Sequence, residues 1–294
     1  MLKKQKKIAL INDFVGYGRC SVAVSLPIIS HLKVNCSVVP TSIFSNHMGF
    51  SIYKMDDYTE EMVEYMKTWK NLGFTFDGIV SGYLASARQA EMVFDFIGKF
   101  HNKKSTQVII DPVMGDHGKL YKSVDEEMIR VMKLLVSKAD IVTPNLTEAC
   151  FLTDIKFKNE GFNKKELLEI ARKIHAIGAK SVVITGIAMQ GYIGNVVYEQ
   201  VQNTEVSYEC KNQIKATKNI ERFAVIRRKK IDNYRGGTGD MFTAIIAADC
   251  VNNIPLIESV KKATKFIQKA IKVTMEFDTP VTDGVCFEEV LSSL

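Results

Sequence analysis

The stretch Gly-Gly-Thr-Gly-Asp, from Gly236 to Asp240, has a composition and spacing that suit work on a phosphate group. Glycines allow a tight turn and a close approach to another molecule. Apolar residues follow at helical spacing from Met241 to Ile246, which predicts that the turn leads into a helix. The first N–H groups of a helix suit an anion, and Asp240 places a carboxylate beside them. The pattern indicates a phosphate beside a base, although the pattern alone is also that of a simple glycine turn.

The elements that must position this turn alternate along the chain. Short apolar runs predict strands at 7–11, 36–40, 78–80, 108–110, 141–142 and 181–184. Helical patterns lie between them at 22–32, 58–72, 87–100, 126–136, 146–152 and 165–177. This alternation predicts an α/β fold with a mostly parallel sheet and helices on both faces. No linker or repeat interrupts it, so we expect one domain over residues 1–294.

The second half of the chain changes its pattern. Residues 191–200, 205–209 and 223–231 look like consecutive strands separated by polar turns, so antiparallel strands are expected there. After Gly239 the pattern is helical again, through residue 248 and then over 256–277. The sheet is therefore expected to be mixed.

Ligands of such sheets bind beyond the carboxyl ends of the strands, where this sequence places polar and glycine residues. Residues 111–116 read Asp-Pro-Val-Met-Gly-Asp, and residues 143–148 read Thr-Pro-Asn-Leu-Thr-Glu. Their carboxylate and amide oxygens are ligands that Mg²⁺ prefers. Phosphoryl transfer requires such a metal ion at the phosphates. Asn145 and Glu148 have the spacing to share one helix face, and they equally suit an N-cap and its capping partner.

These stretches resemble a known family. Gly-Thr-Gly-Asp before a late helix is similar to the signature of the ribokinase-like small-molecule kinases, and the 111–116 and 143–145 stretches resemble the pyridoxal/pyridoxamine (vitamin B6) kinases. The resemblance runs from about Lys7 to about Asp249 and implies a ribokinase-like three-layer fold. It implies an ATP-dependent kinase for the 5′-hydroxymethyl group of a B6 vitamer. It implies that the catalytic residues are Gly237, Thr238, Gly239 and Asp240. The turn formed by these residues would bind the anion, and Asp240 would be the general base.

The resemblance also assigns the nucleotide and metal side of the site. It implies nucleotide binding by Asp111, Asp116, Asn145, Glu148 and Thr185. For Mg²⁺ it implies Asp116 and Glu148, and around a monovalent cation, K⁺ or Na⁺, it implies Asp111, Thr143 and Thr185. We expect the segment 115–120 to be a lid, since phosphoryl transfer needs the exclusion of water.

On the substrate side, Phe-Ser-Asn-His at 44–47 resembles the loop that closes over the pyridine ring, and the Tyr after residues 81–82 resembles a ring-stacking side chain. The predicted substrate-binding residues are Asn12, Phe44, Asn46, His47, Tyr83 and Asp240. Two aromatic residues of this kind also suit a hydrophobic core, and a lone histidine also suits a surface loop.

The sequence departs from the B6 kinases inside the expected ring pocket. Those kinases usually have Ser-His after the first strand, where this chain has Asn12-Asp13, and often Thr where this chain has Met48. An acidic side chain near the ring would favour a protonated amine, and hence pyridoxamine over pyridoxal. The departures concern the substrate and leave the kinase prediction unchanged.

Composition excludes several classes of protein. With 294 residues, 46% of them hydrophobic, the chain can bury a full core. The formal charge of +6 is spread out and forms no basic face interleaved with aromatics, so no nucleic-acid partner is expected. The six cysteines have no metal-ligand spacing, and no apolar run is long enough to span a membrane. We expect a cytoplasmic enzyme whose partners are a small-molecule substrate and a nucleotide, and a homodimer by analogy with the family.

Three alternatives remain open from the sequence. Hydroxymethylpyrimidine kinase of thiamin synthesis shares the fold, the late Gly-Thr-Gly-Asp and a similar heteroaromatic alcohol. A non-catalytic binding protein would have no need of Asp240 as proton acceptor. A dinucleotide-dependent dehydrogenase would need Gly-x-Gly-x-x-Gly after the first strand, and the run from Gly16 to Ser21 lacks the third glycine.

Overall fold

The computed structural model describes residues 4–102, 105–209 and 212–294. Within these residues, nine strands form one sheet in the order β11-β10-β9-β8-β5-β4-β1-β2-β3. Six adjacent strands are parallel to one another: β9, β8, β5, β4, β1 and β2. The other three, β3, β10 and β11, run antiparallel to their neighbours. Their bounds are β1 Lys7–Val15, β2 Asn35–Phe44, β3 Met55–Asp57, β4 Gly78–Ser81, β5 Gln107–Ile110, β8 Ile141–Val142, β9 Ser181–Met189, β10 Tyr192–Glu209 and β11 Asn212–Lys229.

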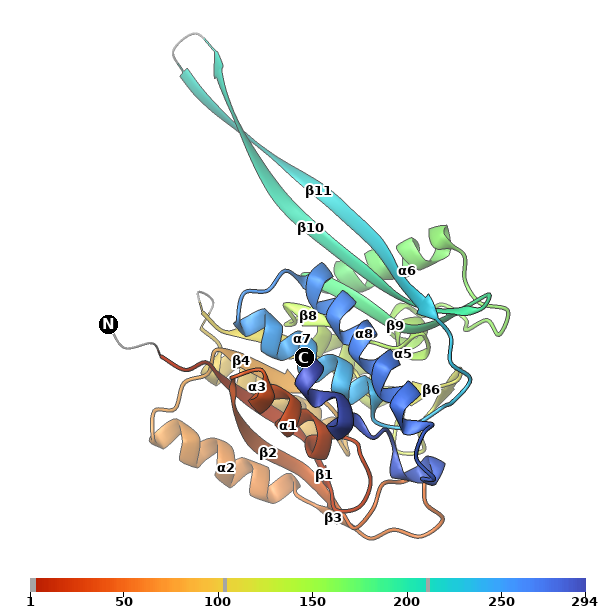
Figure 1. Ribbon diagram of the computed structural model, residues 1–294. Coiled ribbons are helices and arrows are strands. Elements are labelled where there is room, and N and C mark those ends of the chain that lie inside the picture. The colour runs from red at the N-terminus through yellow and green to blue at the C-terminus, as the bar shows by residue number, and fades with distance from the viewer. Residues whose placement is uncertain (1–3, 103–104, 210–211) are drawn as a thin grey trace.

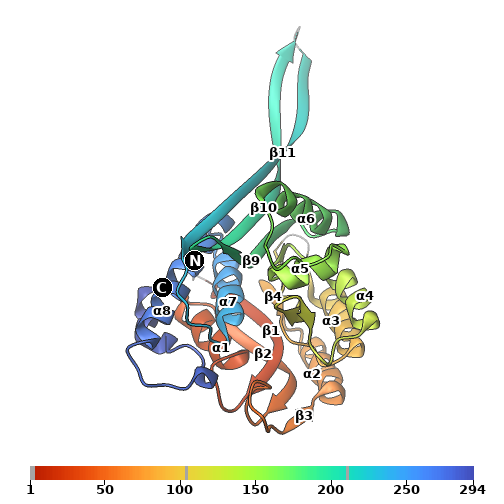
Figure 2. The ribbon, with the colours of Figure 1, turned by 90° about the vertical axis from the view of Figure 1, so that its right-hand side faces the viewer.

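Helices cover both faces of the sheet (Figures 1 and 2). One side carries α2 Thr59–Asn71, α3 Ala87–Phe100, α4 Glu126–Val136, α5 Leu146–Thr153 and α6 Lys164–Ile177. The other side carries α1 Val22–His31, α7 Thr238–Val251 and α8 Leu256–Thr274, followed by the 3₁₀ turns Val281–Asp283 and Phe287–Ser293. The predicted α/β fold, with three layers and a mixed, mostly parallel sheet, is confirmed.

Two hydrophobic cores explain why these layers form. Successive side chains of a strand point to opposite faces, so Ala9 and Ile11 pack under α2 to α6 while Ile8 and Leu10 pack under α1, α7 and α8. All four side chains have at most 1% of their surface exposed. A strand that is apolar on both sides therefore forms the middle of a sheet with helices on both faces.

The predicted short strands at 191–200 and 205–209 are wrong as separate elements. Both belong to β10, which pairs with β11 in unbroken register from Tyr192 opposite Lys229 to Glu209 opposite Asn212. The polar residues between them predict a turn, but in the structure they continue the same strand within one long hairpin, a two-stranded ribbon. The ribbon extends well beyond the helices and the rest of the sheet (Figure 1).

The predicted lid segment forms a small flap of its own. β6 Gly115–Asp116 and β7 Lys119–Leu120 pair antiparallel across a turn at His117 and Gly118, both of which have positive φ. Thr147 accepts a hydrogen bond at its hydroxyl from the Gly118 N–H, at 2.8 Å. The flap thus lies against the start of α5, at the carboxyl-end rim of the sheet.

Among the described residues, none of the helices combines the length and the apolar character that crossing a membrane would require.

Candidate active site

The glycine-rich turn forms the N-terminus of α7, as the sequence predicts. Gly237 is the N-cap residue and has a φ of 81°, and a Cβ there would lie 1.9 Å from the carbonyl oxygen of Arg19. Only glycine fits this position. Gly236 and Gly239 face open space, because a Cβ built on either would meet no atom within 4 Å. The turn is therefore fixed on one side and accessible to a ligand on the other.

Asp240 lies in the first turn of α7, next to the first strand. Its Oδ1 accepts a hydrogen bond from the Asn12 amide at 3.4 Å, and Asn12 Oδ1 in turn accepts from the Tyr83 N–H at 2.7 Å. Burial raises the pKa of Asp240 above its usual value, while hydrogen bonds from the Ser21 backbone and Asn12 lower it in part. Asn12 thus orients the carboxylate, and burial makes the carboxylate a stronger base.

Asp111 follows β5 and lies beside Asp240. Thr243, one helical turn after Asp240, donates its hydroxyl to Asp111 Oδ2 at 3.0 Å, and its hydroxyl also bonds with that of Thr143 at 3.0 Å. Burial, and next the charge of Asp240, raise the pKa of Asp111 to about 7. Both carboxylates line an enclosed hollow of about 10 Å³ together with Asn12. Three segments predicted from sequence therefore meet at one point.

Asn145 and Glu148 form the N-terminal capping box of α5. Asn145 Oδ1 accepts from the Glu148 N–H at 3.0 Å, and Glu148 Oε2 accepts from the Asn145 N–H at 2.8 Å. Glu148 also accepts from the Met114 N–H at 3.1 Å, and Asn145 donates to the Gly115 carbonyl at 2.8 Å. Burial raises the pKa of Glu148, which is 3% exposed, with a further contribution from Asp111. The pair thus holds the 114–115 turn beside Asp111.

The remaining nucleotide-side residues lie along the same rim. Asp116, on the flap, accepts from the Tyr234 hydroxyl at 3.3 Å and lies 3.5 Å from the His117 ring. Thr185, in β9, bridges to Asn145 and donates its hydroxyl to the Pro144 carbonyl at 3.4 Å. The described residues contain no cluster of three or more His, Cys, Asp or Glu side chains that could hold a metal ion by themselves. A metal here would need oxygens from a ligand, as Mg²⁺ bound to nucleotides usually does.

The aromatic residues of the substrate side pack together. Phe44 and Tyr83 form an edge-to-face pair with ring centroids 5.9 Å apart, and Tyr53 lies 6.0 Å from Phe44. Phe44 is 2% exposed and Tyr83 is 9% exposed. The two rings therefore form a small buried cluster of their own, which also includes Val15. This cluster forms a wall beside Asn12.

The loop after β2 folds over this wall and is held from the far end of the chain. His47 Nδ1 accepts from the Gly49 N–H at 3.0 Å, so its Nε2 carries the proton and donates to the Thr282 carbonyl at 2.6 Å. Asn46 donates to the Ile52 carbonyl at 2.7 Å. In this conformation, both side chains hold the loop in place.

The structure adds two residues, Arg235 and Thr243, that the sequence did not assign to the site, and it shows the surroundings of Asp13. Asp13 is 5% exposed, its Oδ1 has no hydrogen-bond partner in the part of the chain described, and burial raises its pKa to about 7. Arg235 is buried and donates to the Pro280 carbonyl at 2.6 Å, which fixes the C-terminal segment against the glycine turn. Thr243 links Asp111 to Thr143 through its hydroxyl. A buried arginine directly before the turn is the one sequence signal that could have indicated the C-terminal contact.

The fold and this site define a class. A mixed sheet between two helical layers, with a glycine turn and an aspartate at the start of a late helix, is the arrangement of the ribokinase-like kinases, as the sequence predicted. The family model described as phosphomethylpyrimidine kinase matches residues 26–283, and the chain belongs to that family.

Curated relatives match this chain in sequence over most of their length. The chain is 23% identical to pyridoxal kinase from Dictyostelium discoideum over 248 residues, which cover 82% of this chain and 77% of the relative. It is 28% identical to pyridoxal kinase from Arabidopsis thaliana over 241 residues, covering 79% and 71%. The predicted resemblance to B6 kinases and the prediction of a kinase are confirmed.

A solved structure covers the whole chain. A Bacteroides thetaiotaomicron protein, provisionally named a phosphomethylpyrimidine kinase, is 32% identical and was crystallised with pyridoxal; the match covers 99% of this chain and 96% of that one, with a TM-score of 0.87. A pyridoxal kinase from Leishmania donovani in complex with ADP and ginkgotoxin matches with a TM-score of 0.82 and 22% identity, covering 98% and 95%. The latter likeness concerns the fold.

Proposed function

We propose that this protein transfers the γ-phosphoryl group of ATP to the hydroxymethyl group of a B6 vitamer. The observation that carries the proposal is the placement of Asp240, buried and oriented by Asn12, beside a helix N-terminus whose Gly236 and Gly239 face open space. A kinase needs a proton acceptor next to a cradle for the group in transfer. The pyridoxal kinases among the relatives support the substrate class.

In the mechanism that we propose, Asp240 is the general base. The substrate hydroxyl donates a hydrogen bond to the carboxylate, and its proton passes to Asp240 as the oxygen attacks phosphorus. Burial raises the pKa of Asp240 and so strengthens it as a base, although it must still be ionised to act. The free N–H groups at Thr238 and Gly239 hold the developing negative charge on the phosphoryl oxygens.

The nucleotide is assigned to the rim formed by the 111–116 and 143–148 segments. Asp116 and Glu148 are the carboxylates that would hold Mg²⁺ with the phosphates, and backbone hydrogen bonds from the Met114 and Asn145 N–H groups fix the two oxygens of Glu148. When bound, Mg²⁺ neutralises charge on the phosphates. Glu148 serves this side by holding the Met114 N–H and the start of α5 in place, and the flap at 115–120 covers the phosphates and excludes water.

A monovalent cation is proposed next to the same rim. Asp111, Thr143 and Thr185 supply carboxylate and hydroxyl oxygens, which suit K⁺ or Na⁺. The isolated β-bridge between Asn145 and Thr185 brings the segment after β8 next to β9 at this point. Activity is expected to rise when K⁺ or Na⁺ is added to an enzyme assayed in tetramethylammonium buffer, and no response to either ion would remove this part of the proposal.

The unpartnered oxygen of Asp13 supports a preference for a protonated vitamer. It is buried in the site beside Asn12 and close enough to Asp240 for the two charges to interact. A buried carboxylate oxygen without a partner costs free energy that a cationic ligand recovers. We expect kcat/KM to be higher for pyridoxamine than for pyridoxal, and a clear preference for pyridoxal would contradict this.

The main rival is hydroxymethylpyrimidine kinase, because the family model carries the name phosphomethylpyrimidine kinase. A direct comparison of kcat/KM with ATP and each alcohol, pyridoxamine, pyridoxine, pyridoxal and hydroxymethylpyrimidine, separates the two. The proposal predicts that the best B6 vitamer exceeds hydroxymethylpyrimidine by at least about tenfold. A reversed order would assign the protein to pyrimidine phosphorylation.

We further propose that residues 1–294 act as one kinase domain and that two copies associate through the β10–β11 ribbon. β10 pairs with β9 only between Tyr192 and Glu199, so in the described chain the ribbon beyond this point has no further strand beside it. A two-stranded ribbon alone is marginally stable in water. A second copy would supply the missing support.

A further inference from the structure

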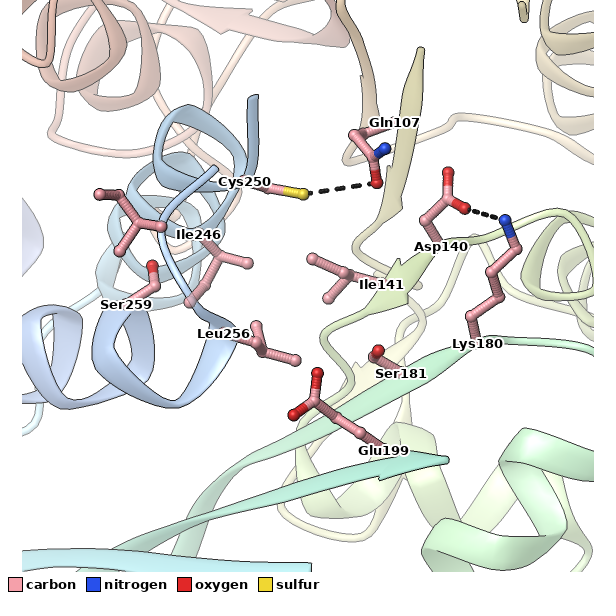
Figure 3. A pocket seen from close by; sticks show the side chains of 11 residues that line it. Gln107, Asp140, Ile141, Lys180, Ser181, Glu199, Ile246, Cys250, Leu256 and Ser259 are labelled. Atoms are coloured by element: carbon pink, nitrogen blue, oxygen red, sulfur yellow. Dashed lines mark hydrogen bonds and ion pairs between the residues drawn. The ribbon is translucent and has the colours of Figure 1, made fainter. Parts of the chain in front are cut away.

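A second cavity lies at the opposite rim of the sheet from the glycine turn (Figure 3). It has a volume of about 300 Å³, which is within the range of small-molecule sites. Its floor is formed by the amino ends of β5, β8 and β9, and its roof by the end of α7 and the start of α8. Helix α7 carries Asp240 in its first turn and Cys250 in its last, about 15 Å apart at 1.5 Å per residue. The two cavities are therefore separate.

The cavity has apolar and polar walls in similar measure, and its polar groups are only partly satisfied. Ile141, Ile246, Ile254 and Leu256 line it. Ser259 also lines it, is 1% exposed, and its hydroxyl has no hydrogen-bond partner among the residues described. A buried hydroxyl without a partner is costly unless a ligand or water meets it.

Glu199 supplies the free charge of the site. It extends from β10 opposite Ser181, and its carboxylate points into the space beside Leu256 (Figure 3). Burial raises its pKa, and the charge of Arg222 on β11 lowers it in part. Nothing in the described part of the chain forms a hydrogen bond or ion pair with this carboxylate, whereas the other acidic side chain in the cavity, Asp140, is paired with Lys180 at 2.5 Å.

The surrounding charges favour a cation over an anion. The cavity is lined by two acidic side chains, Asp140 and Glu199, and one basic side chain, Lys180, which is paired with Asp140. Nearby, Lys262 is paired with Asp249, and Arg222 on β11 acts on Glu199 through its charge without forming an ion pair with it. The C-terminus of α7, the negative end of its helix dipole, also faces this region. The N-terminus of α8 is the positive end of a dipole, and Glu258 in its first turn offsets that charge. In a chain with a formal charge of +6, this is a locally acidic pocket.

The charges of Asp140 and Asp249 also act on the thiol of Cys250, which lines the cavity. Burial first, and then these two carboxylates, raise the pKa of Cys250 to about 12. The thiol donates to Gln107 Oε1 at 3.6 Å (Figure 3). The negative potential therefore extends across the cavity from Glu199 to the end of α7.

From this geometry we propose that the cavity binds a small amphipathic primary amine, whose ammonium group pairs with Glu199 and whose apolar body packs on Ile141, Ile246 and Leu256. The Ser259 hydroxyl offers a hydrogen bond to a polar atom on the same molecule. The site is distinct from the proposed kinase centre and does not depend on the identity of the kinase substrate.

Benzylamine and benzyl alcohol are a matched pair of probes, because they differ in charge and hardly in shape. Each is titrated into the full-length protein with ¹³C-labelled Ile and Leu methyl groups. We expect benzylamine to shift the methyl signals of Ile246 and Ile254, and benzyl alcohol to bind at least about tenfold more weakly. Shifts confined to Leu10, which lines the hollow beside Asp240, would place the amine in the kinase site and overturn the proposal.

Variants locate the charge that recognises the amine. Glu199→Gln is expected to weaken benzylamine binding at least about tenfold, and Glu276→Gln, at an exposed position on the end of α8, is the matched control. Ile254→Trp places a larger side chain at a 43% exposed position on the cavity wall and is expected to block binding without changing the fold. Equal binding of amine and alcohol by the unmodified protein, or unchanged binding in Glu199→Gln, would contradict the proposal.

Discussion

Asp13, Asp111 and Asp240 lie within electrostatic reach of one another at the centre of the site. Burial is the main cause of the raised pKa of each, and the charge of Asp240 adds to it at Asp13 and Asp111. Native proteins keep such an arrangement at a cost in stability, because three buried negative charges repel one another. The cluster is better explained by the binding of cationic or hydroxyl-bearing ligands than by stability.

Asp13→Asn is expected to stabilise the protein, and more so at pH 8 than at pH 5. The native pKa of about 7 lies above the ordinary 3.8, so the native state binds the proton more tightly. The stability that this side chain contributes is therefore present at low pH and lost as pH rises from about 4 to 7. At 1.36 kcal/mol per pKa unit, the effect is at most about 4 kcal/mol at pH 8.

Thermal unfolding of this variant at pH 5 and pH 8 measures the difference. Asp95→Asn, at an exposed position on α3, is the control and is expected to change little at either pH. An equal or larger gain at pH 5 would show that Asp13 is ionised in the native state at low pH.

Thr243→Val removes the hydroxyl that donates to Asp111 and keeps the shape of the side chain. Loss of this hydrogen bond raises the pKa of Asp111 further, since the bond favours the ionised form. With Asp111 needed as an anion on the nucleotide side, the acidic limb of the kcat/KM profile is expected to move to higher pH, and kcat/KM at pH 7 to fall about tenfold.

A pH–rate profile checks this outcome. Thr153→Val provides the control, because the Thr153 hydroxyl is also buried but donates only to carbonyls of its own helix. A profile identical to that of the unmodified enzyme would remove Thr243 as a positioning residue.

At the level of single residues, the sequence could predict which residues lie together at the site. It could not predict the hydrogen-bond partners of each oxygen. Asp111, Asn145 and Asp240 were placed on one rim because each follows a predicted strand or glycine turn. Asp13 was expected near the ring because it follows the first strand, but its burial could not be predicted, because that depends on the neighbouring helix. The capping box of Glu148 was recognisable as one of two alternatives, and the structure shows its hydrogen bonds.

The start of α7 shows how one element creates the chemistry. Gly237 has positive φ and no room for a Cβ, whereas Gly239 is inside the helix and faces open space. The two glycines therefore have different roles. One permits the fold of the turn, and the other leaves room for the ligand.

Gly237→Ala and Gly239→Ala form a matched pair of variants. Gly237→Ala is expected to lower the melting temperature by several degrees, because its Cβ would collide with the Arg19 carbonyl. Gly239→Ala is expected to keep or raise the melting temperature, since alanine is favoured over glycine in a helix by about 1 kcal/mol.

The effects of the two substitutions on catalysis should be the reverse of their effects on the melting temperature. Gly239→Ala is expected to lower kcat/KM for ATP at least about tenfold, because its methyl group occupies space that the phosphoryl group needs. A folded Gly239→Ala variant with unchanged kcat/KM for ATP would show that the phosphate binds elsewhere.

Element boundaries were predictable where apolar periodicity is strong. The predicted helix at 87–100 agrees with α3 at both ends, and 126–136 agrees with α4, since each begins after a side-chain cap, Ser86 or Asp125. The strand predicted at 7–11 continues to Val15, because Asn12 and Asp13 are buried by helices that the local sequence does not reveal. Tertiary contacts thus override the local polarity.

The whole molecule has a body from which a two-stranded ribbon projects (Figure 1). The carboxyl-end rim holds the proposed kinase centre, and the amino-end rim holds the amine cavity. The ribbon was not predictable as a single hairpin, because the polar residues between 200 and 205 have the composition of a turn.

Deleting the outer ribbon tests the proposed association. Replacing residues 202–219 by Asn-Gly joins Val201 and Ile220, which lie opposite each other, through a two-residue turn suited to hairpins. The body is expected to keep its melting temperature within a few degrees, while the mass in solution by light scattering changes from dimer to monomer. A variant that remains dimeric, or an unmodified protein that is monomeric, would contradict association through the ribbon.

The proposed mechanism depends on Asp240 accepting the proton of the substrate alcohol next to the phosphate cradle. Asp240→Asn keeps the size of the side chain and its contact with Asn12 but removes the base. The account predicts that kcat with ATP and pyridoxamine falls by about 10²- to 10⁴-fold, while calorimetry gives a Kd for ADP within about threefold of the unmodified enzyme. Turnover near the unmodified rate would show that Asp240 is not the base.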